Sequence, residues 1–253
     1  MTVSELYKIL DKKIPRELSC EWDNDGLMCC PDGEREVKRV LIALDVTGEV
    51  TDFACAHGYD LIVSHHPFIF KGLKGIDEQS FVSKKAIKLI KNNVSVFSFH
   101  TRLDALSGGV NDVLASLLGI KNAVPFGDEG IGRIGELDSE IDIITLGKKV
   151  KDALGCDGVF VSDGGRKCHM VAVLGGSGDD DIFAAIAAGA DTYISGELKH
   201  HSMTDAPDMG INLISAGHFH TEAPVCEAIK NMILEIDADI ICDVISSNKI
   251  QLI

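Results

Sequence analysis

The sequence lacks the features that mark membrane, nucleic-acid-binding and disulfide-bonded secreted proteins. Its longest apolar runs, such as Val40–Leu44, are far too short to span a bilayer. Charges interrupt the first residues, MTVSELYKILDKKI, so we expect no signal core and a cytoplasmic location. Basic residues are few: 24 Lys and Arg stand against 39 Asp and Glu, a formal net charge of −15. This balance disfavours binding to nucleic acid and to anionic membrane surfaces.

Two familiar motif types are also missing. The eight cysteines include no C-x-x-C pair, which disfavours a zinc knuckle or a thioredoxin-type site, and we expect reduced, buried thiols. No G-x-x-x-x-G-K-[ST] phosphate loop occurs. Hydrophobic residues make up 45% of the 253 residues, which is enough for a sizeable core. What remains is a globular protein of one large domain or two small ones.

Hydrophobic periodicity predicts alternating strands and helices. In the first half, strands and helices alternate over Val37–Asp45, Gly48–His57, Asp60–Ser64, Gln79–Asn92 and Val94–Phe99. After a glycine- and charge-rich segment that follows Pro125, the rhythm restarts with strand Ile131–Leu137, helix Asp138–Leu154 and further strands and helices. This order is typical of an α/β protein with a mostly parallel sheet covered by helices.

Metal-binding side chains follow three of these strands, at the point where each strand ends. The segments read SHHP (64–67), HTRLD (100–104) and GHFHTE (217–222). Ligands of open parallel sheets bind beyond the carboxyl ends of the strands, so we expect the three segments to share one edge. Imidazoles bind first-row metals, and carboxylates bridge pairs of them. The candidate metal ligands are His65, His66, Asp104, His218 and Glu222.

The local spacing within these segments also bears on the site. Adjacent residues of a strand point to opposite faces, but Pro67 bends the chain, so His65 and His66 can reach two ions. His218 and Glu222 share a face if a helix has begun there, whereas Pro224 favours a pre-helical turn. A histidine doublet alone is more often structural, and it is the three segments together that favour a metal site.

The remaining histidines and one glycine cluster carry less weight. His57 is expected to cap a helix end, and whether His200 and His201 border the metal crevice is left open. His169 lies outside the three segments. The GGSG segment at 175–178 is interpreted as a tight turn before an acid-capped helix, in preference to a phosphate loop.

The motifs SHHPFIF, HTRLD, SGELKHH and GHFHTE, in this order, with WDNDGL near Trp22, resemble the GTP cyclohydrolase I type 2 family. Its members are also described as NGG-interacting-factor-three-like dinuclear-metal proteins. The resemblance runs from about Glu21 to Glu222. It implies two interlocked α/β domains, residues 1–126 plus 212–253 and residues 127–211, with the metal site at their junction. It also implies a homo-oligomer, a hexameric toroid built as a trimer of dimers.

Carried over by position, the resemblance assigns a role to each ligand. It implies that His65 and Asp104 bind one metal, that His66 and His218 bind the other, and that Glu222 bridges them. A further histidine, His100, would lie beside the metals. Three positions depart from the commoner family pattern: Asp25 within WDN-x-GL, Arg102, and the additional imidazole of His220.

Two classes of function fit these ligands. The first is a metal-dependent hydrolase of the GTP cyclohydrolase kind, in which metal-activated water acts on a nucleotide or related small molecule and Glu222 is catalytic. The second is a non-catalytic iron chaperone, a metal store or a scaffold ring. Iron, zinc, manganese, nickel and cobalt all accept these ligands, and about two ions per chain are expected. Arg102 is interpreted either as a cation for an anionic substrate or as a surface arginine.

Overall fold

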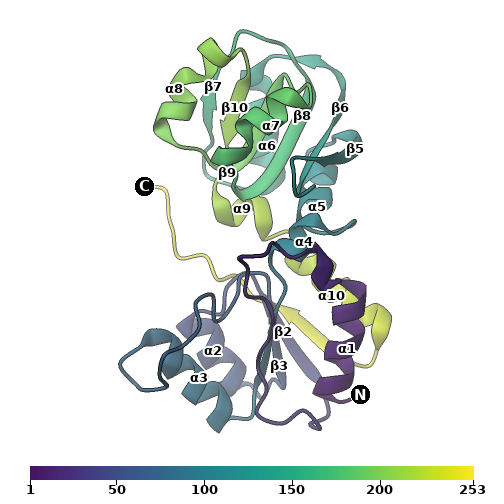
Figure 1. Cartoon of the computed structure of the whole chain (residues 1–253), viewed down its shortest axis with the longest axis vertical. Coiled ribbons are helices and arrows are strands. Elements are labelled where there is room, and N and C mark those ends of the chain that lie inside the picture. Colours follow the sequence, from purple (N-terminus) through teal and green to yellow (C-terminus); the bar gives the residue numbers. More distant parts are fainter. The chain divides into compact units, whose positions relative to one another are not determined.

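The computed structural model describes residues 1–253, which form two compact units (Figure 1). Unit 1 comprises Met1–Leu103 and Val225–Lys249, and unit 2 comprises Asp104–Pro224 and Ile250–Ile253. The predicted domain boundaries follow residues 126 and 211. In the structure, the chain passes from one unit to the other after residues 103 and 224. No helix in the chain combines the length and the apolar character that crossing a membrane requires.

Unit 1 contains a five-stranded sheet with the order β1-β4-β3-β2-β11. Its strands are β1 (Gly26–Cys29), β2 (Arg39–Ala43), β3 (Leu61–Ser64), β4 (Ser95–Ser98) and β11 (Ile241–Val244). All neighbours pair in parallel except β1, which is antiparallel to β4. Every residue of β3 and β4 is buried, as a strand covered on both faces requires. The predicted mostly parallel sheet is therefore confirmed for this unit.

Helices cover both faces of this sheet (Figure 1). They are α1 (Val3–Lys13), the 3-10 helix η1 (Arg16–Leu18), α2 (Gly48–Ala56), α3 (Phe81–Lys91) and α10 (Val225–Ile236). On one face, Ala54 of α2 and Leu89 of α3 pack into a core with Leu41, Ile62 and Val96. On the other face, α1 contributes Tyr7, whose ring lies 5.1 Å from that of Phe97. Strands β3 and β4 are therefore packed against helices on both faces.

Unit 2 contains a six-stranded mixed sheet with the order β5-β6-β8-β9-β10-β7. Its strands are β5 (Lys121–Phe126), β6 (Gly132–Ile141), β7 (Phe160–Ser162), β8 (Cys168–Ser177), β9 (Thr192–Glu197) and β10 (Asn212–Ser215). Strands β8, β9 and β10 are parallel, and the other pairs are antiparallel. The candidate segment GHFHTE therefore follows the last strand of the parallel part.

The helices of unit 2 are α5 (Val110–Leu117), α6 (Ile143–Leu154), η2 (Asp179–Asp181), α7 (Ile182–Ala187), α8 (His200–Met209) and α9 (His218–Glu222). A further short helix, α4 (Thr101–Ala105), contains the boundary between the units. Helices α5 and α6 pack on one face of the sheet with Val171, and α7 and α8 pack on the other with Ala172. Adjacent residues of β8 thus serve opposite cores.

Two element predictions need correction. The helix predicted over Asp138–Leu154 begins only at Ile143, because residues up to Ile141 extend β6 and pair with Cys168 of β8. Asp142 then caps the helix by accepting the N–H of Thr145 at 2.9 Å. The helix predicted over Ala223–Ile236 is α10, which begins at Val225, directly after Pro224, and is preceded by the separate short helix α9.

Candidate metal centre

Three histidines of unit 1 lie together where β3 and β4 end. His65 and His66 follow β3, and His100 comes shortly after β4, its parallel neighbour. One ligand atom from each histidine lies within 4.8 Å of the other two. Their ring centroids are 5.1 to 5.8 Å apart. Parallel pairing thus brings side chains 34 residues apart in the sequence into one cluster of imidazoles.

Each of these imidazoles is fixed by a hydrogen bond through Nδ1. The pairs are His65 with the Phe99 carbonyl (2.9 Å), His66 with Asp45 Oδ1 (2.7 Å) and His100 with Asp23 Oδ1 (2.9 Å). Carbonyl and carboxylate oxygens only accept, so in the neutral rings Nδ1 carries the proton and Nε2 carries the lone pair. Metal-binding histidines are commonly oriented by partners of this kind. The donor set therefore fits a transition metal bound through Nε2.

Asp23, from the WDNDGL segment, organises the start of α4. Its Oδ2 accepts the N–H and the hydroxyl of Thr101 at 3.1 and 2.7 Å, while Oδ1 accepts from His100. Burial alone would raise the pKa of the Asp23 carboxyl, but hydrogen bonds from His100 and Thr101 outweigh it and lower the pKa to about 2. In the sequence this acid stands out only as part of the WDNDGL motif, and its role in orienting His100 is visible only in the structure.

Arg102 is fully buried, so its interpretation as a surface arginine is wrong. Its Nε donates to Asp25 Oδ2 (3.0 Å), and its Nη1 donates to Asp11 Oδ1 (2.7 Å) and to the Ile14 carbonyl (2.9 Å). Asp25 is also buried, and it accepts the backbone N–H of His100 at 3.2 Å. Two of the departures from the family pattern thus form one buried ion pair, which anchors α4 instead of facing a substrate.

The GHFHTE segment of unit 2 forms α9, so the helical alternative predicted from its spacing is correct. His218 Nε2 lies 3.0 Å from Glu222 Oε2, four residues along the same face. His218 Nδ1 lies 3.5 Å from Glu197 Oε2 at the end of β9. The side chain of Glu222 is only 6% exposed. A buried carboxylate beside an imidazole is therefore the second candidate ligand pair.

Glycines in the sheet of unit 2 make room for this pair. A Cβ at Gly176 of β8, where φ is +67°, would overlap Glu222 Oε1, and one at Gly196 of β9 would lie 2.8 Å from the Cα of His218. The tight turn predicted over GGSG is wrong, since Gly175 and Gly176 continue β8 and only Gly178 lies beyond it. Glycine within a strand pattern often marks a close approach of another backbone, and that signal was present in the sequence.

Asp104 is the remaining predicted ligand. It is the fourth residue of α4 and is buried in unit 2. Its carbonyl accepts a hydrogen bond from Asn111 Nδ2 at 3.4 Å, and Asn111 Oδ1 in turn accepts the N–H of Gly175. Asp104 is thereby tied to the β8 segment beside Glu222.

Comparison with known proteins identifies the family of this chain. A family model described as Duf34/NIF3 (NGG1p interacting factor 3) matches residues 1–251. The chain belongs to the Duf34/NIF3 family. Curated relatives named GTP cyclohydrolase 1 type 2 homolog include one from Clostridium perfringens, 33% identical over 95% of this chain and 94% of the relative. Another, from Methanocaldococcus jannaschii, is 31% identical over 88% and 90%. The resemblance inferred from the motifs is confirmed.

Solved structures of Duf34/NIF3-like proteins share the fold. Staphylococcus aureus protein SA1388 superposes with a TM-score of 0.90 and 27% identity, covering 100% of this chain and 99% of that one. Reduced HcgD from Methanocaldococcus jannaschii gives a TM-score of 0.85 and 28% identity over 96% and 97%. These likenesses confirm the α/β fold class.

Other histidines of this Duf34/NIF3 member have separate roles. His57 is the C-cap of α2, as predicted; its Nδ1 lies 2.9 Å from the Phe53 carbonyl and its ring stacks on Phe53. His220 contacts the ring of Phe219, with centroids 5.7 Å apart. Two residues from His218 on a helix, His220 projects from a different side of α9.

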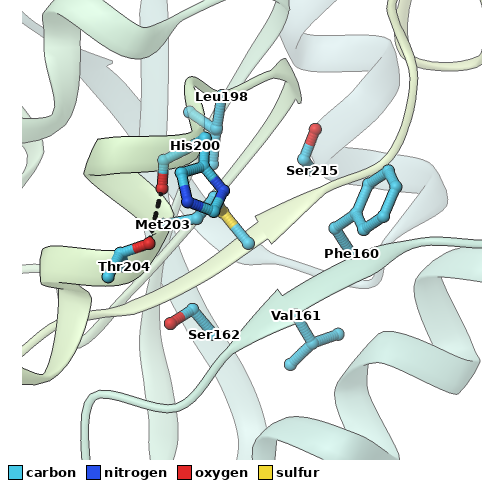
Figure 2. A pocket seen from close by; sticks show the side chains of 8 residues that line it. All are labelled: Phe160, Val161, Ser162, Leu198, His200, Met203, Thr204 and Ser215. Atoms are coloured by element: carbon cyan, nitrogen blue, oxygen red, sulfur yellow. Dashed lines mark hydrogen bonds between the residues drawn. The ribbon is translucent and has the colours of Figure 1, made fainter.

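His200 begins α8 and lines a pocket of about 400 Å³ in unit 2 (Figure 2). The pocket lies between α8 and the edge strand β7, with Phe160 on its far side from His200. Neither His218 nor Glu222 lines it. His200 of the SGELKHH segment therefore lines this pocket, and the predicted metal ligands are not among the residues that line it.

Proposed function

We propose that this protein holds two divalent transition-metal ions in a dinuclear centre and acts as a metal-dependent hydrolase of a nucleotide or related small molecule. The ligands are those predicted from the sequence. His65 and Asp104 would bind one ion, His66 and His218 would bind the other, and Glu222 would bridge the two.

The orientation of the imidazoles in unit 1 carries this proposal. Three imidazoles lie together, and the Nδ1 of each is engaged by an acceptor, as is common for metal-binding histidines. Histidines that serve only packing need a partner for each ring nitrogen and have no need to lie beside other imidazoles. The names of the curated relatives support the nucleotide part of the proposal.

The pair in unit 2 supports it as well. An imidazole nitrogen and a carboxylate oxygen on one helix face could both bind the same transition-metal ion. His218 Nε2 and Glu222 Oε2 are separated by 3.0 Å. Imidazole with carboxylate suits iron, zinc, manganese, nickel and cobalt alike, so the ligands leave the metal open.

Two bound metal ions would supply water with a pKa lowered toward 7 and a binding site for a substrate oxygen. The protein's own groups position that chemistry. Asp45 and Asp23 keep the His66 and His100 rings in the tautomer that presents Nε2. Glu222, buried against Gly176, supplies negative charge at the site, and we assign it the catalytic role.

The ligand assignment is tested by metal content and anomalous scattering. We expect about two ions per chain after reconstitution. His66→Ala and His218→Ala should weaken the same ion, and Asp104→Ala the other. Elemental analysis that finds no metal, or one ion lost in all three variants, would contradict the assignment.

The activity is tested by a hydrolase screen on metal-defined protein, with Glu222→Gln as the matched variant. Gln keeps the size of the side chain and removes its charge, so turnover should fall while the fold survives. Stable metal binding without turnover would favour the alternative of metal delivery, storage or a scaffold. The proposed homo-hexamer, a trimer of dimers, is tested by light scattering, and a monomer mass would contradict it.

A further inference from the structure

A second feature of unit 1 is a pocket of about 450 Å³ beside the histidine cluster. It is lined by the segment after β2, the segment after β3 and the first turns of α3. His66 is part of its wall. An occupant would therefore touch an imidazole that the proposed function assigns to a metal ion.

Aromatic rings form much of the wall. Phe68 is buried, whereas Phe70 is 47% and Phe81 is 77% exposed. Rings that are exposed to this extent contribute little buried area to the core of unit 1. Aromatic faces beside a cavity favour flat rings, which pack against them in offset or edge-to-face arrangements.

The charged groups of the wall favour an anion. Its cations are Lys71 and Lys85, and its one acid is Asp45. The carboxylate of Asp45 is already engaged by His66 at 2.7 Å and by the Ser247 hydroxyl at 3.0 Å. The wall thus has a local excess of positive charge in a chain whose formal net charge is −15.

Lys85 is held inside the pocket and does not extend into solvent. Its Nζ donates to the Val46 carbonyl at 2.5 Å and lies 5.3 and 5.7 Å from the ring centroids of Phe68 and Phe81. An ammonium group has three protons, and this hydrogen bond uses one. Burial lowers the pKa of Lys85, as expected for a cation taken partly out of water.

We propose that this pocket binds a molecule that combines a flat aromatic ring with an anionic group, the ring against Phe68 and Phe81 and the anion at Lys85. The role of this pocket as a substrate subsite rests on the proposed function, because His66 lines the pocket and is also a proposed metal ligand. Binding of the ring and the anion does not rest on it, because every residue that lines the pocket belongs to unit 1.

The probe is 2-naphthalenesulfonate, which has a flat ring, an anion and no bond that a hydrolase would cleave. It is titrated calorimetrically into the full chain, both metal-free and loaded with zinc. We expect saturable binding in both forms. Two matched probes each lack one half, 2-naphthol the anion and sulfate the ring, and each should bind at least about tenfold more weakly, a loss of about 1.4 kcal/mol.

Variants locate the site. Lys85→Met should weaken the sulfonate about tenfold and leave 2-naphthol unchanged, and Lys85→Arg should restore most of the affinity. Lys84→Met, an exposed neighbour on α3 outside the pocket, is the matched control and should bind as the parent does. Phe81→Leu should weaken sulfonate and naphthol alike, whereas Phe183→Leu, an equally exposed phenylalanine of unit 2, should weaken neither.

Each contrary result overturns the inference. Absence of sulfonate binding removes the pocket as a binding site. Equal affinity for 2-naphthol and the sulfonate, or equal loss in Lys84→Met and Lys85→Met, removes the role of Lys85. Failure of the proposed function looks different: the chain would take up no metal, or show no turnover, while it still bound the sulfonate.

Discussion

The two units position their candidate ligands by different physical means. In unit 1, hydrogen-bonding and charged partners hold the rings: Asp45 and Asp23 orient His66 and His100, and Arg102 anchors the helix that follows. In unit 2, what positions His218 and Glu222 is the absence of side chains at Gly176 and Gly196. A site of the first kind should be sensitive to changes of charge, and one of the second kind to changes of volume.

The largest effect is expected at the buried ion pair of unit 1. Arg102→Met should lower the free energy of unfolding by about 3–5 kcal/mol, because it leaves the buried carboxylate of Asp25 without its cation. Urea denaturation measures this. Arg16→Met, at an exposed arginine of the same unit, should stay within about 0.5 kcal/mol of the parent. A cost below about 1 kcal/mol for Arg102→Met would show that charge does not hold this region.

The next effect tests volume in unit 2. Gly176→Ala should lower the free energy of unfolding by about 3 kcal/mol, since the added Cβ meets Glu222 and the backbone has a positive φ. Gly155→Ala is the matched control: its φ is also positive, but nothing lies near its Cβ, so a cost of about 1 kcal/mol is expected. Equal costs for the two variants would mean that backbone conformation alone matters, and that Gly176 does not make room for Glu222.

The same contrast explains what could be predicted from the sequence. Buried strands such as β3 and β4 leave a local pattern of apolar residues, and their ends locate His65 and His100. The partners of these rings leave no such pattern. Asp45 is 21 residues from His66, and Asp25 is 77 residues from Arg102, so an acid that orients a ring looks like any other acid.

In unit 2, strand pairing determined the structure of segments whose local sequence pattern indicated something else. The residues from Asp138 to Ile141 are polar enough to suit the first turn of a helix, yet they extend β6 because β8 offers hydrogen bonds to its end. Strand β5 was not predicted, since most of its side chains are exposed at the sheet edge and show no alternation. Such elements depend on neighbours that only the tertiary fold supplies.

A smaller effect, on metal affinity, is expected for Asp45, which orients the imidazole of His66 in unit 1. Asp45→Asn keeps the shape of the side chain but removes the charge that favours the Nδ1-protonated ring of His66, so metal affinity should fall about 10-fold to 100-fold. A competitive titration with a chromophoric chelator measures the change. Asp52→Asn, at an exposed acid of α2 that pairs with Lys88, should leave the affinity unaltered. Unchanged affinity in Asp45→Asn would separate His66 from the metal centre.

The smallest effect on the free energy of unfolding is the acid sensitivity that Asp23 gives to unit 1. Its pKa is about 2 in the folded chain, against an ordinary value of 3.8, so the unfolded chain takes up the proton first as the pH falls. The stabilisation is therefore complete above about pH 5 and is lost toward pH 2, by about 2 kcal/mol for this carboxylate with a buried side chain. The difference in unfolding free energy between the parent and Asp23→Asn, measured by urea denaturation at several pH values, should shrink by that amount on acidification. Glu21→Gln, at an exposed neighbouring acid, should show no such convergence. A difference that is independent of pH would mean that Asp23 acts by shape alone, and unit 1 would then resemble unit 2 in how it positions a ligand.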